Sequence, residues 1–346
     1  MRIKSIAGML AVLWLIAFEL SAWTSQSLRE TSLQVANPNS AVLTSADKED
    51  LSLVLRVQAS LGAQIWPGFG RAAIPIILFN EHDEFLIGAT NPPAPWTVVE
   101  ADDFQGHPYY RRAAGTAQAF AAPVGAEWAG SISTLEWTNL KSPMKLGRDS
   151  HSVALLHEMF HAFQAKQSLA HFKSAQAVYK VEARYPFNDP DFAAAWNNEG
   201  SMLAAALKVK DDADVRRAAH EFLQARAARR TRASLRPELV DFERELEWLE
   251  GLASYVEIRS YELAASHAGE APFADFKPSL PLHLRMSFFR LEKQMGSQKG
   301  DMRFYLSGMA QARLLDRLGT GWQAQALGDR AYLEDLLREV AGSDAK

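Results

Sequence analysis

The chain has 346 residues, of which 48% are hydrophobic and 23% are charged, a composition typical of a globular protein with one large domain or two modest ones. Its net charge of −4 excludes a strongly basic protein, so we expect no nucleic-acid partner. Because the sequence contains no cysteine, disulfides cannot stabilise the fold, and any metal ion must be held by histidine and carboxylate side chains.

The first 25 residues have the pattern of an export signal. A basic start, MRIK, precedes an apolar run over residues 6–18, which is short for a membrane span but typical of a signal peptide. Ala22 offers a weak cleavage site, so residues 1–25 are either a signal peptide or a membrane anchor. Both interpretations predict an extracytoplasmic protein that is periplasmic, secreted or associated with a membrane. The polar residues 26–48 predict a loose lead-in.

Residues 49–148 have the pattern of an N-terminal α/β subdomain. Apolar runs of strand length, separated by turn-like sequences, occupy residues 73–80, 84–89 and 96–101. Further strand-like sequence follows over residues 118–137, with Gly125 and Gly130 as expected breaks. These segments predict a small sheet.

Residues 149–346 have the pattern of a helical subdomain. Its first helix has possible capping residues near Asp149, followed at helical spacing by an expected buried face of Val153, Leu156, Phe160 and Phe163. Pro237 is suited to begin a later helix. The basic cluster RAARRTR, residues 226–232, is interpreted as a solvated helix end.

The first of these helices carries the sequence His157-Glu158-Met-Phe-His161. Histidines four positions apart lie one turn apart on the same helix face, so both imidazoles can reach one metal ion. Glu158 is offset from them, close enough to act on a water molecule without binding the metal. Zinc is the expected ion because it accepts imidazole and carboxylate ligands and leaves one position for water. The alternative is a coincidental spacing of two histidines.

A catalytic zinc site requires a third protein ligand, and two glutamates are candidates. Glu199, in WNNEG, is the closer to the motif in sequence, and it falls on an apolar helix face where a charge is costly unless paired or metal-bound. Glu250, in EWLEGLASYVE, lies on an acidic row beside an apolar helix face. Such a row is normally a solvated flank, but Gly251 and Ala253 would allow another helix to approach closely.

The segment EWLEGLASYVE resembles the second-helix signature of the gluzincin metallopeptidases, particularly their aminopeptidase branch. Those proteins carry Trp-Leu-x-Glu-Gly-x-Ala-x-Tyr-x-Glu, and this chain matches it with one residue missing before the glutamate. The resemblance implies an α+β fold with a small N-terminal sheet packed on a mainly helical, zincin-like catalytic core. It also implies Glu250 as the third zinc ligand. The interval between His161 and Glu250 is longer than usual in the family, so Glu199 stays open.

The same resemblance implies further site residues. A tyrosine downstream of the third ligand donates to the oxyanion in the aminopeptidases, and Tyr305 is suitably placed, although a half-buried packing role fits it equally. Residues 123–134 are expected to form an edge strand that pairs with an extended peptide. Glu127 on that strand is a candidate substrate-binding residue, as is Glu199 if Glu250 binds the metal.

These features predict an exported zinc metallopeptidase that acts on a peptide or protein substrate, with Glu158 as the general base. Two alternatives stay open: a non-peptidase zinc hydrolase on the same scaffold, and an envelope assembly or binding protein with a silent zinc site.

Overall fold

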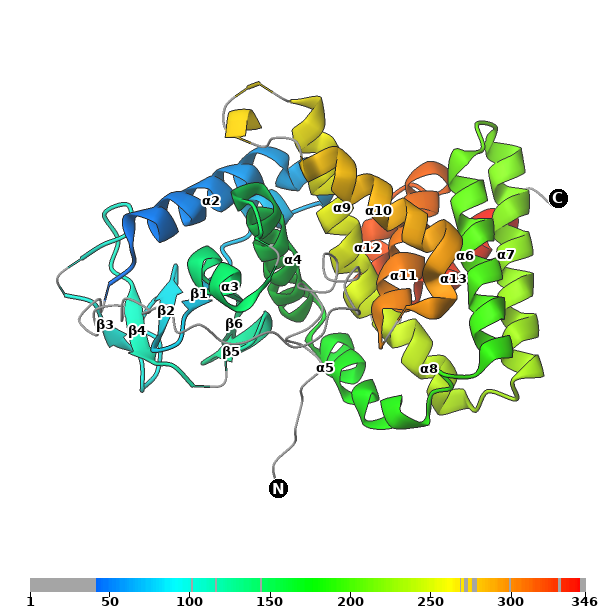
Figure 1. The fold of residues 1–346 in the computed structure, drawn as a ribbon, viewed down its shortest axis with the longest axis horizontal. Helices are drawn as coiled ribbons and strands as arrows, with labels where there is room; N and C mark the ends of the chain where they lie inside the picture. The colour runs from blue at the N-terminus through cyan, green and yellow to red at the C-terminus, as the bar shows by residue number, and fades with distance from the viewer. Residues whose placement is uncertain are drawn as a thin grey trace, which may run out of the picture. The chain divides into compact units, whose positions relative to one another are not determined.

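The computed structural model describes residues 42–100, 102–115, 117–143, 145–267, 269–270, 273–275, 279–298, 300–328 and 331–342. Strands cluster in the first part of this chain and helices form the rest (Figure 1), so the predicted α+β class is confirmed. The expected signal or anchor at residues 1–25 lies outside the described residues. Within them, no helix combines the length and apolar character that a membrane span requires.

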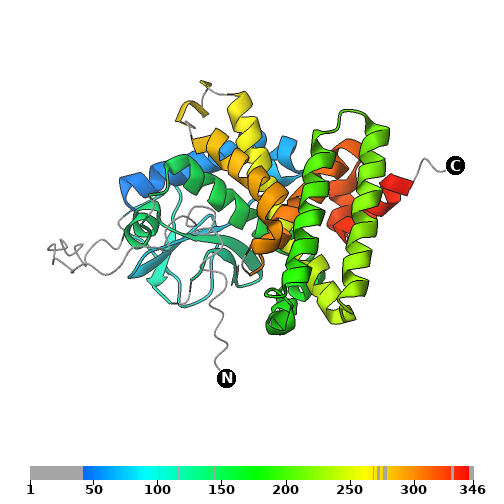
Figure 2. The same cartoon turned by 45° about the vertical axis from the view of Figure 1, so that its right-hand side comes forward.

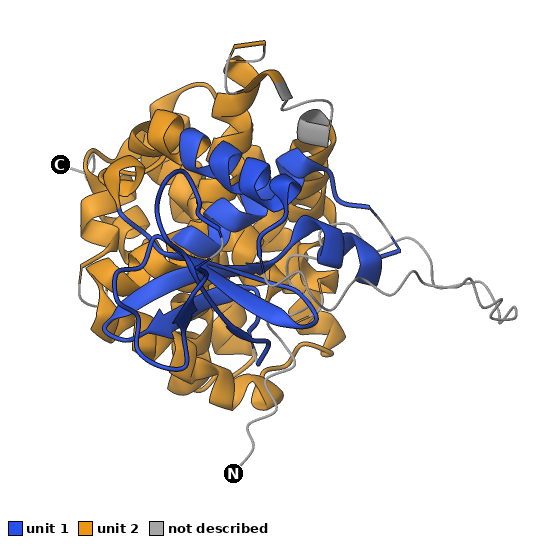
Figure 3. Cartoon of the chain, turned by 90° about the vertical axis from the view of Figure 1, so that its left-hand side faces the viewer, with its two compact units in different colours: residues 1–56, 73–159 blue, residues 57–72, 160–346 orange. Residues whose placement is uncertain are grey.

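The chain divides into two compact units, drawn in blue and orange in Figure 3. Unit 1 contains residues 1–56 and 73–159, and unit 2 contains residues 57–72 and 160–346. The division passes through two helices, α2 (Ser45–Ile65) and α4 (Arg148–Gln167).

The sheet belongs to unit 1. Its described strands are β1 (Ile76–Phe79), β2 (Asp83–Ile87), β3 (Thr97–Val98), β4 (Tyr110–Ala113), β5 (Phe120–Val124) and β6 (Glu127–Ser133). Their order is β3-β4-β2-β1-β6-β5, with β1 and β6 parallel and the other neighbours antiparallel. The strands expected within residues 73–80, 84–89, 96–101 and 118–137 are therefore confirmed, whereas β4 was not predicted.

Strand β6 has a different place from the one predicted for it. It pairs with β1 on one side and with β5 on the other, so the expectation that residues 123–134 form an edge strand is wrong for β6, and β5 is the edge. Gly125 has a φ of 62° in the turn between β5 and β6, as expected of a break. Gly130 is no break, because it lies inside β6, where an added Cβ would stand 2.8 Å from the Met159 Cα. That close approach seats α4 against the sheet.

Helix α2 was also missed, because residues 45–48 belong to a helix and not to the expected loose lead-in. Its start is a reciprocal cap, in which the Asp47 amide donates to the Thr44 hydroxyl and the Thr44 amide donates to the Asp47 carboxylate. Its buried residues recur at helical spacing: Leu51, Val54, Val57, Leu61 and Ile65. Unit 1 also contains α3 (Leu135–Lys141), which is capped by Thr134.

Unit 2 is helical, as predicted for the second half of the chain. Its helices are α5 (Leu169–Ala177), α6 (Pro190–Lys208), α7 (Asp212–Arg232), α8 (Pro237–Leu246), α9 (Leu252–Ser266), α10 (Ser279–Gln294), α11 (Met302–Leu318), α12 (Trp322–Ala326) and α13 (Leu333–Gly342). Helix α8 begins at Pro237, as expected. A single π-helical turn, Glu247–Gly251, joins α8 to α9 without a break, and we refer to these five residues as the π-turn.

A buried network of ion pairs links α6, α7 and α8. Helices α6 and α7 run side by side (Figures 1 and 2). Between them, Glu199 of α6 lies 3.1 Å from Arg226 and 2.5 Å from Arg229 of α7. Arg229 also lies 2.6 Å from Glu243 of α8, and Arg226 lies 2.7 Å from Glu247 of the π-turn. Each charge has a partner of opposite sign at hydrogen-bonding distance, which burial requires.

One interpretation made from the sequence is therefore wrong for these residues. The cluster at residues 226–232 is not simply a solvated helix end, because Arg226 and Arg229 are buried. The acidic row that contains Glu243 and Glu247 is buried as well, which agrees with the close helix approach expected at Gly251 and Ala253. Burial alone would lower the pKa of Arg226, but the nearby carboxylates outweigh it and raise that pKa.

Candidate metal centre

Helix α4 presents the predicted histidine pair and glutamate together. His157, Glu158 and His161 are all buried, and one ligand atom from each lies within 4.8 Å of the others. The expected apolar face of α4 is buried too. Within unit 2, Phe160 of that face makes edge-to-face contacts with Trp66 and Phe69, at centroid distances of 5.0 and 5.6 Å. This packing fixes the end of α4 that carries His161.

Of the two candidate third ligands, Glu250 is the one beside His161. The distance from His161 Nε2 to Glu250 Oε2 is 3.2 Å, and both side chains are buried. Glu199 instead lies between Arg226 and Arg229, where its charge is neutralised. A charge on this apolar face was expected to be either paired or metal-bound, and Glu199 is paired with two arginines.

Gln164 stands behind His161 on the same helix. Its amide nitrogen donates to the carbonyl oxygens of Trp248 and Leu249, at 2.9 and 3.2 Å. Its oxygen lies 2.9 Å from His161 Nδ1. A carbonyl oxygen can only accept, so Nδ1 of His161 carries a hydrogen, and in the neutral ring Nε2 presents its lone pair towards Glu250.

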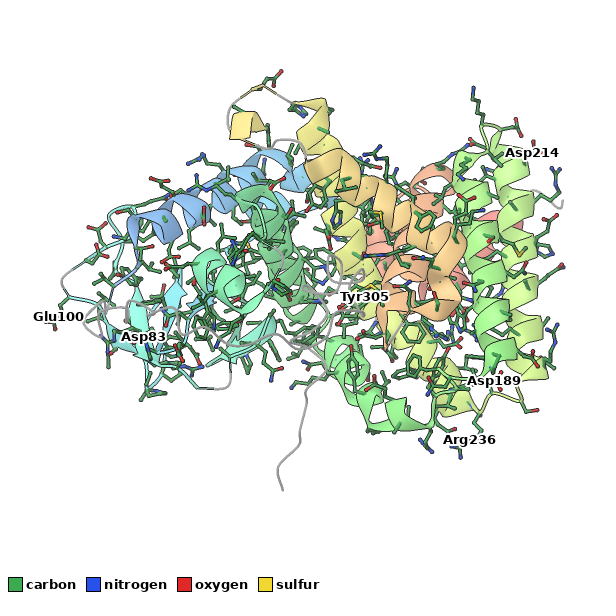
Figure 4. All side chains as sticks on the ribbon, viewed as in Figure 1. Asp83, Glu100, Asp189, Asp214, Arg236 and Tyr305 are labelled. Carbon is green, nitrogen blue, oxygen red and sulfur yellow. The ribbon has the colours of Figure 1, made fainter. Side chains whose placement is uncertain are left out.

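Two tyrosines flank the Glu250 carboxylate. The Tyr179 hydroxyl lies 3.4 Å from Glu250 Oε1 and donates to Asp301 Oδ2 at 2.8 Å. The Tyr305 hydroxyl, on α11 (Figure 4), hydrogen-bonds to Glu250. Burial, followed by the neighbouring carboxylates of Glu250 and Asp301, raises the pKa of Tyr305. Both phenols therefore stay protonated and can donate hydrogen bonds at neutral pH.

Asp301 adds a second acidic group near Glu250. Burial and the charge of Glu250 raise the pKa of Asp301 to about 7, although the hydrogen bond from Tyr179 acts in the opposite direction. The surroundings of Glu250 therefore disfavour a second negative charge on Asp301.

The π-turn that carries Glu250 is held from several sides. Glu247, at its start, receives the bidentate ion pair from Arg226 and a hydrogen bond from the Ser307 hydroxyl. Gly251, at its end, faces Gly308 of α11 so closely that an added Cβ would stand 2.5 Å from the Gly308 Cα. A single π-helical turn within an α-helix inserts an extra residue and often occurs at a functional site.

Glu127, the candidate substrate-binding residue, and two further residues, Tyr255 and His171, are not among these contacts. Glu127 is exposed at the start of β6 in unit 1. Tyr255 donates to Asp316 at 3.0 Å and not to Glu250. His171 stacks on Trp248 at 3.9 Å and lies 3.0 Å from Glu245.

Sequence reasoning missed Gln164, Tyr179 and Asp301. Gln164 had a usable signal, because it follows His161 by three positions on the same helix and is a polar residue on a helix expected to be buried. Tyr179 and Asp301 had no such signal in the sequence. Tyr179 follows α5 and Asp301 precedes α11, and only the packing of these helices brings them to Glu250.

Comparison with family models, with curated protein sequences and with solved structures found no match for this chain.

The donor set and its spacing suit a zinc ion. Two imidazoles and a carboxylate, with water as the fourth ligand, form a common catalytic zinc site. Ligand atoms about 2.0–2.1 Å from a tetrahedral zinc lie about 3.3–3.4 Å apart, close to the 3.2 Å between His161 Nε2 and Glu250 Oε2. His161 and Glu250 are therefore spaced as two ligands of one zinc ion would be.

Proposed function

We propose that this protein is a zinc-dependent hydrolase that cleaves peptide bonds, with His157, His161 and Glu250 as the metal ligands. The observation that carries the proposal is the 3.2 Å approach of His161 Nε2 to Glu250 Oε2, on the helix that also presents His157 and Glu158. With Gln164 accepting from Nδ1, a neutral His161 ring turns its Nε2 lone pair towards Glu250, and a shared cation would stabilise that arrangement.

The roles of the side chains follow from their chemistry. Bound zinc would polarise the scissile carbonyl and make a water molecule more acidic. Glu158 accepts the proton of the attacking water and passes it to the leaving amine. A neutral phenol supplies the second donor to the developing oxyanion, and Tyr305 and Tyr179 are the two phenols beside Glu250.

The proposal is tested with protein purified without chelator and digested against a peptide library and an ester panel. We expect about one zinc per chain, cleavage of peptides, and loss of activity on chelation. Glu158→Gln should keep the zinc and lose nearly all turnover, whereas Glu221→Gln on the exposed face of α7 should change neither.

Other outcomes separate the alternatives. Hydrolysis of esters but not of peptides would point to a non-peptidase zinc hydrolase. Stoichiometric zinc with no hydrolysis of either panel would point to a binding or assembly protein with a silent site. Absence of zinc in the purified protein, together with no uptake on titration, would overturn the proposal.

A further inference from the structure

Gln164 connects the two segments that carry the proposed ligands. It accepts from His161 on its own helix and donates to the backbone of the π-turn, which lies 84 and 85 positions away in the sequence. We propose that Gln164 is a positioning residue that sets both the tautomer of His161 and the place of Glu250, so that the two ligand atoms are prearranged for a metal ion. This inference rests on the proposed zinc site.

The orientation of the Gln164 amide is fixed by its surroundings. The carbonyl oxygens of Trp248 and Leu249 only accept, so both must face the amide NH₂ group. The amide oxygen is then turned to His161 Nδ1, at 2.9 Å. A flipped amide would place an oxygen against two carbonyl oxygens and an NH₂ group against Nδ1. Only one orientation satisfies all the contacts, and it leaves Nε2 as the ligand atom of His161.

The same amide acts on Glu250 through the backbone. Trp248 and Leu249 are the two residues immediately before Glu250 in the π-turn, so a displacement of their peptide groups also displaces the Glu250 side chain. Elsewhere in the π-turn, an added Cβ on Gly251 would stand 2.5 Å from the Gly308 Cα, and the indole nitrogen of Trp248 donates to the Ala326 carbonyl at 2.6 Å. Gln164 therefore fixes the backbone before Glu250 relative to α4.

The burial of Gln164 supports a positioning role. Its side chain is fully buried, where an amide without partners would be unfavourable, and all three of its hydrogen bonds go to the two ligand-bearing segments. Partners of this kind, one shell behind the ligands, orient them, and their removal typically weakens metal binding about 10–100-fold.

Two substitutions separate the two contacts. Gln164→Met removes both the acceptor for His161 and the donors for the π-turn at similar volume. Gln164→Glu keeps an acceptor for His161 but sets a carboxylate against the carbonyls of Trp248 and Leu249. Gln167→Met, at the exposed end of α4, is the matched control. Zinc affinity is measured by competition with a chromophoric chelator on the full chain, and the fold of each metal-free variant by circular dichroism.

We expect both Gln164 variants to bind zinc about 10–100-fold more weakly than the parent, and Gln167→Met to bind it as the parent does. If both Gln164 variants bind zinc like the parent, the inference is wrong while the zinc site stands. If Gln164→Glu alone retains full affinity, the link to the π-turn is irrelevant and the coupling fails.

Failure of both Gln164 variants to fold without metal would make Gln164 a residue of the fold and overturn the positioning role. If only Gln164→Met fails to fold, the zinc affinity of Gln164→Glu alone decides whether the positioning role holds. Absence of zinc binding in the parent would instead refute the proposed function, and the inference with it.

Discussion

Two buried glutamates of unit 2 contact different partners, so the same substitution should affect zinc binding at one and stability at the other. Glu250 lies 3.2 Å from His161, whereas Glu199 lies between two arginines at 3.1 and 2.5 Å. Glutamine is nearly isosteric with glutamate, so the packing is preserved while the charge is removed. We expect Glu250→Gln to lose zinc and Glu199→Gln to lose stability.

The two magnitudes can be estimated separately. Removing one partner of a buried ion pair costs about 3–5 kcal/mol, and 1 kcal/mol shifts the Tm of a domain of about 150–250 residues by about 2–4 °C. Glu199→Gln should therefore lower the Tm of the metal-free protein by about 6–20 °C. Glu250→Gln should lose the stability that bound zinc adds to the folded protein, about 4 kcal/mol when free zinc is about 1,000 times its Kd.

The assay is differential scanning calorimetry of both variants and the parent, with zinc and with chelator, together with zinc analysis. Glu250→Gln should melt like the metal-free parent and gain little from zinc. Glu199→Gln should melt earlier but still gain from zinc as the parent does. If Glu199→Gln loses zinc while its metal-free Tm is unchanged, Glu199 is the ligand and the assignment of Glu250 is refuted.

Three further predictions concern the surroundings of the site. Tyr305→Phe should lower kcat by about 10²–10³ with KM and zinc content little changed; a change within threefold would leave Tyr179 as the phenol to test. Gly308→Ala should destabilise the protein by about 1–3 kcal/mol in urea unfolding, because its Cβ would stand 2.5 Å from the Glu247 carbonyl oxygen. The control Gly342→Ala, with no atom within 4 Å of its Cβ, should leave the stability unchanged. If Gly308→Ala is as stable as this control, the close packing of the π-turn is contradicted. Glu334 of α13 joins the buried ion-pair network, 3.4 Å from Arg226 and 2.9 Å from Arg230. Burial would raise the pKa of Glu334, but Arg230 and Arg226 outweigh it and lower that pKa to about 2. A carboxylate with a depressed pKa contributes stability above its ordinary value near 4.5, and this contribution is lost as the pH falls towards 2. Urea unfolding should therefore show falling stability between pH 4.5 and 3, and a constant value over that range would contradict a stabilising role of the arginine–glutamate network.

The motif helix could be predicted because its pattern is local. The spacing of His157 and His161 fixes their common face as soon as the segment is helical, and the apolar residues at helical spacing around them predict which face is buried. The apolar strands β1 and β2 were predictable for the same reason. Strand β4, with the polar sequence YRRA, gave no such pattern, because its pairing with β2 depends on neighbours distant in sequence.

The choice of third ligand could not be derived from local pattern. Glu199 and Glu250 each precede a glycine on a helix, and both lie on buried faces. They differ in the residues that they contact: Glu199 pairs with two arginines of α7, and Glu250 contacts a histidine of α4. The same non-local pairing explains why the basic cluster at residues 226–232 was expected in solvent, although Arg226 and Arg229 are buried against glutamates of other elements.

The most direct test of the zinc site is anomalous diffraction at the zinc edge from crystals of the protein purified without chelator. The proposed site predicts one strong peak about 2.0–2.1 Å from His161 Nε2 and from Glu250 Oε2, with His157 as the third protein ligand. A zinc-saturated crystal without a peak at His161, or a peak whose ligands exclude Glu250, would contradict it.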